Sequence, residues 1–365
     1  MRVVILGAGV IGSAIAYYLS LRGIGAMVIE RSGVANAASG KSGGFLARDW
    51  CSGQPQDELA RTSFELHRDL ARALPADYGY RPVTTFAAAV SAQRSFKHHA
   101  PALGSAWIDG DCAVHQRLGD ETSTAQLHPA LFTQALLDQA VVNGARLHCG
   151  VVESLVTQSA APRVTGVQVD GEVVAADAVV IAMGPWSMLA AQWLPLPPVF
   201  GLKGYSITLQ PRSAIAAETL FLDYEDAAGE RHGPELVPRA DGEVYLCGFG
   251  DEEPVPVSPD DVSIDAQACE QLQAIAGRVS SALADAPVTR RQACYRPVCQ
   301  DAMPVMGPVP GVSGAYIATG HNCWGMLNAP GSGLAMAELL AEGRASSLDL
   351  APFDPARLEV CRIGA

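Results

Sequence analysis

The amino-terminal thirty residues or so constrain the fold of this chain more than any other stretch. Residues 2–6 (RVVIL) have strand character, and the glycine-rich sequence GAGVIG follows at once in residues 7–12. An alanine-rich apolar stretch of helical period continues to Leu21, and a second strand-like run, AMVIE, ends at Glu30. Strand, glycine turn, helix, strand and terminal acid in this order predict the dinucleotide-binding unit of an α/β protein.

Each glycine of this turn has a predicted task. Gly7 allows the tight turn, Gly9 lets the backbone approach a pyrophosphate, and Gly12 lets the helix pack closely on the sheet. The helix N-terminus offers N–H groups to the phosphates, and a carboxylate at Glu30 can accept both hydroxyls of an adenosine ribose. A glycine-rich turn of purely structural purpose is the alternative interpretation. The candidate cofactor contacts in this unit are Gly7, Gly9, Val10, Ile11, Gly12, Glu30 and Arg31.

The segment after Glu30 favours a flavin over a nicotinamide cofactor. Residues 35–50, ANAASGKSGGFLARDW, are crowded with small side chains, which lets the backbone approach something flat and anionic. A nicotinamide enzyme would usually continue into another βα unit here. A flexible Gly/Ser linker is the alternative interpretation. The candidate contacts in this loop are Ser39, Gly40, Lys41, Ser42, Gly43 and Gly44.

Two distant segments are expected to return to the same site. Residues 173–187 give a strand that ends in Gly-Pro-Trp, and residues 313–333 give a strand followed by glycines. We expect a helix from about Ser332 onward, with its positive end available to the negative charge of a reduced flavin. A simple N-cap turn would explain Gly331 and Ser332 but not the preceding GHNCWG. The candidate contacts are Val152, Gly184, Trp186, Gly320, His321, Asn322, Cys323, Trp324, Gly325 and Met326.

Composition excludes several classes of partner. A net charge of -13 opposes attraction to nucleic acid or anionic membrane surfaces. The nine cysteines contain no CxxC pair and no metal-ligand spacing with histidine, so we predict no metal site and reduced thiols in the cytoplasm. The apolar run of residues 3–19 is short for a membrane span and carries regularly placed glycines, so no span is expected.

The chain resembles the FAD-dependent D-amino-acid, glycine and sarcosine oxidase family. The resemblance rests on GAGVIG with Glu30, ASGKSGG, AVVIAMGPWS, PVFGLKGYS, VPRADGEVYLCG, CYRPVCQDAMPVMG and GHNCWGMLNAPGSG, in the family's order across nearly the whole chain. The sequences ASGKSGGFLARDW and GHNCWG resemble those of an uncharacterised branch of the family more than those of any well-studied oxidase. The resemblance implies FAD as the cofactor.

The resemblance also implies the fold: a Rossmann-like α/β FAD-binding domain interleaved with a smaller α+β substrate domain built on an antiparallel sheet. The FAD-binding domain would comprise residues 1–85, 140–200 and 290–365, and the substrate domain residues 86–139 and 201–289. The residues agree in outline, because residues 200–250 alternate in strand fashion and residues 265–284 have helical period. Residues 250–262, DEEPVPVSPDD with its flanks, are the expected exposed loop.

Arg296 is the candidate anchor for substrate. It stands beside Pro297, which would help to fix its direction, and family members place an arginine of this motif on the substrate carboxylate. A planar guanidinium can make two parallel bonds to a carboxylate. A structural ion pair with an Asp or Glu is the alternative. Cys294 falls where the sarcosine-oxidase branch links a cysteine to the flavin, and an inert packing cysteine is the alternative.

The implied reaction is oxidation of the C–N bond of a small amino acid or secondary amine by hydride transfer to flavin N5, with O2 or another acceptor taking the electrons and O2 giving H2O2. No dedicated base is required for a neutral amine. We predict Arg296, His321 and Tyr245 as the catalytic residues, Tyr245 as part of the pocket wall. A 2-hydroxy acid dehydrogenase, with His321 as the base, and a non-catalytic flavoprotein that assists assembly or binding are the alternatives.

Overall fold

A six-stranded, mostly parallel sheet carries the amino-terminal turn. Its strands are β1 (Val3–Leu6), β2 (Met27–Glu30), β8 (Arg146–Cys149), β12 (Ala178–Ile181), β19 (Val305–Pro308) and β20 (Ala315–Thr319). Their order is β19-β20-β12-β1-β2-β8, and only the β19–β20 pair is antiparallel. The strands expected at the N-terminus are confirmed, with Val4 of β1 opposite Met27 of β2. This computed structural model describes residues 1–96, 103, 106–158 and 162–360.

Both faces of this sheet are covered. Helix α1 (Val10–Ser20) packs between α3 (Pro129–Val142) and α6 (Gly325–Glu342), and α2 (Asp57–Ala73) packs on α6. The other face is covered by an antiparallel sheet of β9 (Val152–Gln158), β10 (Arg163–Val169) and β11 (Glu172–Ala175). Val3 and Ile5 of β1 join the helical core, whereas Val4 and Leu6 join the opposite core. In the part of the chain that the structure describes, no helix is long and apolar enough to cross a membrane.

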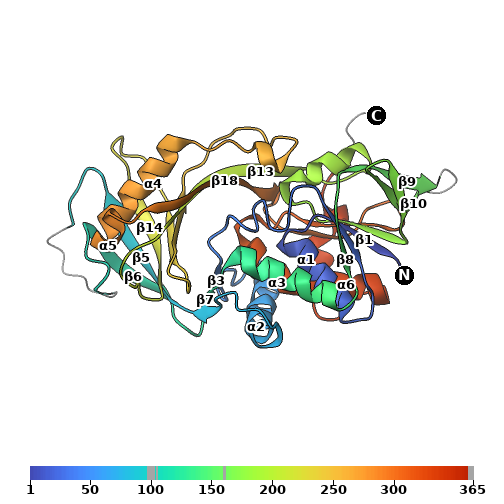
Figure 1. The fold of residues 1–365 in the computed structure, drawn as a ribbon, viewed down its shortest axis with the longest axis horizontal. Helices are drawn as coiled ribbons and strands as arrows, with labels where there is room; N and C mark the ends of the chain where they lie inside the picture. The colour runs from blue at the N-terminus through green and yellow to red at the C-terminus, as the bar shows by residue number, and fades with distance from the viewer. Residues whose placement is uncertain (97–102, 104–105, 159–161, 361–365) are drawn as a thin grey trace.

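An eight-stranded sheet forms the second lobe, seen on the left of Figure 1. Its path is β18-β13-β17-β16-β14-β5-β6, with β15 paired to β14, and most pairs are antiparallel while β14 and β5 are parallel. The expected helix over residues 265–284 is confirmed as α4 (Ala266–Val279) and α5 (Ser281–Ala284), which pack on this sheet. The strands are β5 (Thr84–Ser91), β6 (Cys112–Gly119), β13 (Val199–Leu209), β14 (Glu218–Glu225), β15 (Arg231–His232), β16 (Glu235–Pro238), β17 (Val244–Gly248) and β18 (Val288–Cys299).

Two long strands join the lobes. β13 and β18 pair along their length, from Val199 opposite Cys299 to Leu209 opposite Val288, and they run from one lobe to the other (Figure 1). A small sheet of β3 (Phe45–Ala47), β7 (Thr124–Gln126) and β4 (Arg81–Pro82) lies near the junction. The 3-10 helices are η1 (Gly184–Gln192), η2 (Pro259–Asp261), η3 (Asn322–Trp324), η4 (Ala351–Phe353) and η5 (Pro355–Arg357).

Helix α6 begins earlier than the sequence predicted. It starts at Gly325 rather than near Ser332, and Pro330 lies inside it. A proline in a helix removes one backbone hydrogen bond, here to the carbonyl of Met326. His67 of α2 satisfies that carbonyl, with Nε2 2.9 Å from it. Ser63 of α2 accepts the Gly331 N–H at 3.1 Å, so tertiary contacts allow the helix to continue through the proline.

Packing places α3 with the first lobe. The sequence assigned residues 86–139 to the substrate domain, yet buried α3 residues such as Phe132 and Leu136 join the core around α1. Residues 290–299 of β18, assigned to the FAD-binding domain, hydrogen-bond along β13 of the large sheet. We propose that the domain division follows this packing. Parts of the predicted ranges, residues 97–102, 104–105, 159–161 and 361–365, lie outside the described residues.

Candidate active site

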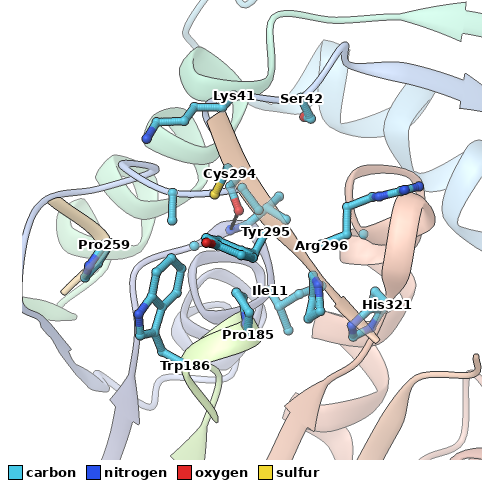
Figure 2. A pocket seen from close by; sticks show the side chains of 18 of the residues that line it. Ile11, Lys41, Ser42, Pro185, Trp186, Pro259, Cys294, Tyr295, Arg296 and His321 are labelled. Atoms are coloured by element: carbon cyan, nitrogen blue, oxygen red, sulfur yellow. Dashed lines mark hydrogen bonds between the residues drawn. The ribbon is translucent and has the colours of Figure 1, made fainter. Parts of the chain in front are cut away.

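A cavity of about 910 Å³ lies between the carboxyl ends of the parallel strands and the large sheet. Segments far apart in the sequence surround it, and Figure 2 shows Lys41, Trp186, Cys294, Arg296 and His321 around the space. All the predicted site residues line this cavity except three glycines. A side chain at Gly12 would meet the Gly7 carbonyl, at Gly40 the Ala35 carbonyl and at Gly320 the Cys299 sulfur, so these glycines serve packing behind the cavity wall.

The amino-terminal turn has the geometry that its glycines predict. Gly7 has φ +106°, and a Cβ there would lie 2.5 Å from the Ala182 carbonyl oxygen of the neighbouring strand. At Gly12 a Cβ would lie 2.0 Å from the Gly7 carbonyl oxygen, so only glycine lets α1 pack this closely. The Glu30 carboxylate accepts the N–H of Ala8 at 2.8 Å, which places the acid at the end of β2 beside the turn.

Tertiary contacts hold the loop of residues 35–50 against the cavity. Ser39 Oγ accepts the N–H of Val10 at 2.8 Å, at the start of α1. The Tyr245 hydroxyl donates to the Lys41 carbonyl at 3.0 Å, and Arg239 donates to the Ser42 carbonyl at 3.0 Å. These bonds come from two different lobes, so the interpretation as a free Gly/Ser linker is wrong. Tyr245 thereby positions the loop, and its hydroxyl is engaged with backbone.

The start of α6 faces the cavity through Trp324, Gly325 and Met326. The N–H groups of its first turn have no partner within the helix, so this end carries partial positive charge. His321, just before it, is buried, and its Nε2 lies 2.9 Å from Ser332 Oγ. Burial lowers the pKa of His321 to about 3, so the imidazole is neutral near pH 7 and a weak proton acceptor.

Arg296 lines the cavity and has no ion-pair partner among the described residues. Its side chain is exposed where β18 lines the cavity, and Figure 2 shows it extending away from Cys294 and Tyr295 toward the segment that carries His321. Among the described residues, no carboxylate oxygen lies within 4.0 Å of its guanidinium. A structural ion pair, the alternative from the sequence, is therefore not what the structure contains.

Cys294 lines the cavity close to Lys41 (Figure 2). Burial raises the pKa of its thiol to about 11, although the charge of Lys41 lowers it in part. A thiol with such a pKa is protonated near pH 7, and it is the thiolate that reacts. The arrangement therefore favours the packing interpretation, and attachment to FAD remains a prediction of the resemblance. Cys299 is buried behind the wall against Gly320.

Trp324 was predicted from the sequence, but the aromatic cluster to which it belongs, at one end of the cavity, was not. Phe45, Trp50, Phe221 and Trp324 all line it, and none is fully buried. Phe221 contacts Trp50 with ring centroids 4.7 Å apart and Phe45 at 5.0 Å, while Trp50 and Trp324 are 6.3 Å apart. The four rings come from three regions of the chain, so no local sequence pattern predicts that they cluster. They give this end of the cavity an apolar wall.

Glu235 was also missed. It begins β16 and lines the cavity, in a stretch, GPELVP, that matches no general motif. The side chain of Lys203 is fully buried, and it pairs with Glu253 and, at 3.7 Å, with Asp251. This ion pair holds residues 250–262, the segment expected to be an exposed loop, against the body of the protein.

The segment 250–262 crosses from the large sheet to the first lobe beside the cavity. Its residues Val257 and Pro259 line the cavity. Much of the segment is exposed, as expected, but it is anchored at several points. Backbone carbonyls of the segment accept hydrogen bonds from both lobes: Tyr295 donates to the Pro254 carbonyl at 2.9 Å, and Trp186 and Arg31 donate to the Pro256 and Val257 carbonyls, each at 2.7 Å. The Asp260 carboxylate accepts from Ser32 at 2.9 Å and from Asn36 at 2.8 Å.

The fold and the cavity define a dinucleotide-binding protein in which two lobes enclose the ligand. The chain matches the DAO family of FAD-dependent oxidoreductases over residues 2–339, and it belongs to that family. A putative oxidoreductase of Schizosaccharomyces pombe is 28% identical over 380 residues, covering 97% of each chain. Glycine oxidase of Pseudomonas aeruginosa is 28% identical over 391 residues, covering 97% of this chain and 98% of that protein. The crystal structure of glycine oxidase from Geobacillus kaustophilus superposes with a TM-score of 0.81 at 24% identity, covering 98% of this chain and 99% of that one.

The protein is therefore an FAD-dependent oxidoreductase, and the cavity fits this cofactor. Two helix N-termini, those of α1 and α6, face the cavity and suit an anionic ligand. Gly184 has φ +55° and lines the cavity, and a Cβ there would meet no atom within 4 Å, so the ligand can approach its backbone. The expected fold class, a Rossmann-like FAD-binding domain with an antiparallel-sheet α+β partner, is confirmed.

Proposed function

We propose that the protein oxidises the C–N bond of an amino acid or secondary amine. The observation that carries the proposal is Arg296, a cation on the cavity wall without an ion-pair partner among the described residues. A planar guanidinium suits a carboxylate, which amino acids supply. Bound FAD supplies the two-electron acceptor for this reaction. The glycine oxidase relatives support an amino-acid substrate, and O2 is the proposed final acceptor, reduced to H2O2.

We propose that FAD is held by the predicted residues that line the cavity. The turn from Gly7 to Ile11 and the start of α1 would face the pyrophosphate, and Glu30 the adenosine ribose. Residues 39–44 would lie along the cofactor, with their backbone fixed by Tyr245 and Arg239. The start of α6 would stabilise negative charge on the ring system. Arg31 would help indirectly, by anchoring the segment 250–262.

Oxidation of a 2-hydroxy acid fits the site less well. Removing hydride from an alcohol needs a base for the hydroxyl proton, and the sequence assigned that task to His321. The imidazole is buried against Ser332, and its pKa of about 3 makes it a poor acceptor for such a proton. A neutral amine needs no such base, because its own lone pair forms the imine. His321 is therefore unsuited to the task that the hydroxy-acid alternative gave it.

The proposal is tested by replacing Arg296. Arg296→Leu should raise KM for an amino-acid substrate by at least about 100-fold, since a charge-assisted pair is worth about 3 kcal/mol in an enclosed site. KM for an amine without a carboxylate should change little. Steady-state kinetics with both substrates measures this difference. Arg291→Leu, on the same strand but exposed outside the cavity, is the matched control. Equal KM values in Arg296→Leu and the parent protein would place the anchor elsewhere.

A further inference from the structure

Glu235 occupies a particular place on the cavity wall. It is the first residue of β16, opposite Phe221 of β14 on one side and Cys247 of β17 on the other. All three residues line the cavity, so one row of the sheet presents an aromatic ring, a carboxyl group and a thiol to the ligand. Among the described residues, no cationic nitrogen lies within 4.0 Å of the Glu235 carboxylate. A carboxylate thus faces the ligand space without an ion-pair partner.

Glu235 and Arg296 act at the same end of the cavity. Burial raises the pKa of Glu235, and the positive charge of Arg296 and the thiol of Cys247 lower it in part. The charges of Glu235 and Arg296 both affect the pKa of the Cys323 thiol, beside Trp324, and that of the Cys247 thiol. Glu235 also raises the pKa of Tyr245 on β17. A cation and a carboxylate therefore face one ligand from different strands, without pairing directly.

We propose that Glu235 binds the amino group of the substrate and accepts its proton. This role depends on the proposed oxidation of an amine, and it makes Glu235 the residue that deprotonates the substrate before oxidation. Near pH 7 an amino acid arrives with a protonated amine, whose lone pair is not available for imine formation. One N–H bond of the ammonium breaks and one O–H bond forms on the carboxylate, giving a neutral amine and a neutral carboxyl group with no change in electron count. The proton returns to water when product leaves.

The same arrangement defines the substrate class. Arg296 would take the carboxylate and Glu235 the amine, which together select an α-amino acid over a simple amine or a carboxylic acid. Phe221 neighbours Glu235 in the sheet and belongs to the aromatic cluster with Trp50 and Phe45. This wall offers apolar surface to the substituent on the α-carbon. The inferred substrate is an α-amino acid with an apolar side chain, rather than one with a second charge.

The test is the pH profile of kcat/KM for Glu235→Gln with an apolar amino acid. Without the carboxylate to accept a proton, only substrate whose amine is already deprotonated in solution reacts. The value of kcat/KM should therefore fall by about 100-fold at pH 7 and recover about tenfold per pH unit toward the pKa of the amine. The parent protein should retain its activity at the lower pH. Glu235→Asp should keep the parent profile at a reduced rate. Glu270→Gln, an exposed change on α4, is the matched control.

Two results would overturn the inference in different ways. A Glu235→Gln protein whose kcat/KM falls by one factor at every pH would show that the carboxylate serves structure alone, while the proposed function would stand. Failure of every amino acid and amine to reduce the flavin of the parent protein without oxygen would overturn the proposed function and the inference together. FAD absorbance and the unfolding midpoint of each variant show whether it has folded.

Discussion

At the scale of single residues, Tyr245 shows how a cavity residue can act through the backbone. The sequence placed it among the catalytic residues, but its hydroxyl donates to the Lys41 carbonyl and its ring packs on Gly43. Burial raises the pKa of Tyr245 well above its usual value, so the hydroxyl keeps its proton near pH 7. Its contribution is therefore the position of the loop that we expect to hold FAD.

Tyr245→Phe should accordingly weaken FAD binding and spare chemistry. Losing one hydrogen bond costs about 0.5–1.5 kcal/mol, so the Kd of the apoprotein for FAD should rise about two- to tenfold. The rate constant kcat of the FAD-saturated variant should stay within about twofold of the parent, because no proton of this hydroxyl takes part. Fluorescence titration with FAD and steady-state kinetics measure the two quantities. A 100-fold loss of kcat with unchanged FAD affinity would restore Tyr245 to a catalytic role.

At the scale of elements, helix α6 depends on α2. Pro330 interrupts the hydrogen bonding of α6, and His67 bonds the freed Met326 carbonyl at 2.9 Å and the Leu327 carbonyl at 3.1 Å. A carbonyl only accepts, so Nε2 must carry a hydrogen. Burial lowers the pKa of His67 to about 4, which means that the folded protein holds the imidazole neutral. The start of α6, which faces the cavity, is thus stabilised by a side chain outside the site.

This arrangement predicts a loss of stability in mild acid. The unfolded chain protonates His67 below about pH 6.5, whereas the folded protein resists protonation until about pH 4, so stability is lost as pH falls through this window. Protonation of His67 in the unfolded chain lowers the free energy of unfolding by about 2 kcal/mol at pH 5. His67→Gln, which can still donate to the carbonyl, should reduce the difference in unfolding free energy between pH 7.5 and pH 5 by that amount. Urea unfolding measures it, with His115→Gln, an exposed histidine, as control. An unchanged difference would contradict the account.

At the scale of the whole molecule, the sequence predicted what local order encodes. Strand, GAGVIG, helix and Glu30 predicted the first unit, and nearly all of the candidate residues, from segments far apart in the sequence, line the cavity. Glu235 and the cluster around Phe221 were missed because the sheet order β13-β17-β16-β14 brings them together, and strand order is not local information. The start of α6 was misplaced because Pro330 normally breaks a helix, and the sequence does not reveal that contacts from α2 compensate.

The same limit applies to the segment 250–262. Its prolines and acids are typical of an exposed loop, and much of it is exposed. Its anchoring by Lys203, Trp186 and Arg31 follows from the approach of the two lobes, which composition does not reveal. The apolar positions of α3 likewise do not say which sheet they cover, and we propose from its packing around α1 that this helix belongs with the first lobe.

We propose that this FAD-dependent enzyme oxidises amino acids rather than hydroxy acids. The most direct measurement mixes the FAD-loaded protein, without oxygen, with apolar amino acids and with 2-hydroxy acids of the same side chains, and follows the visible absorbance of oxidised flavin. The account predicts that at least one amino acid bleaches this absorbance and that its hydroxy acid counterpart does not. Bleaching by the hydroxy acids alone, or by neither class, would contradict it.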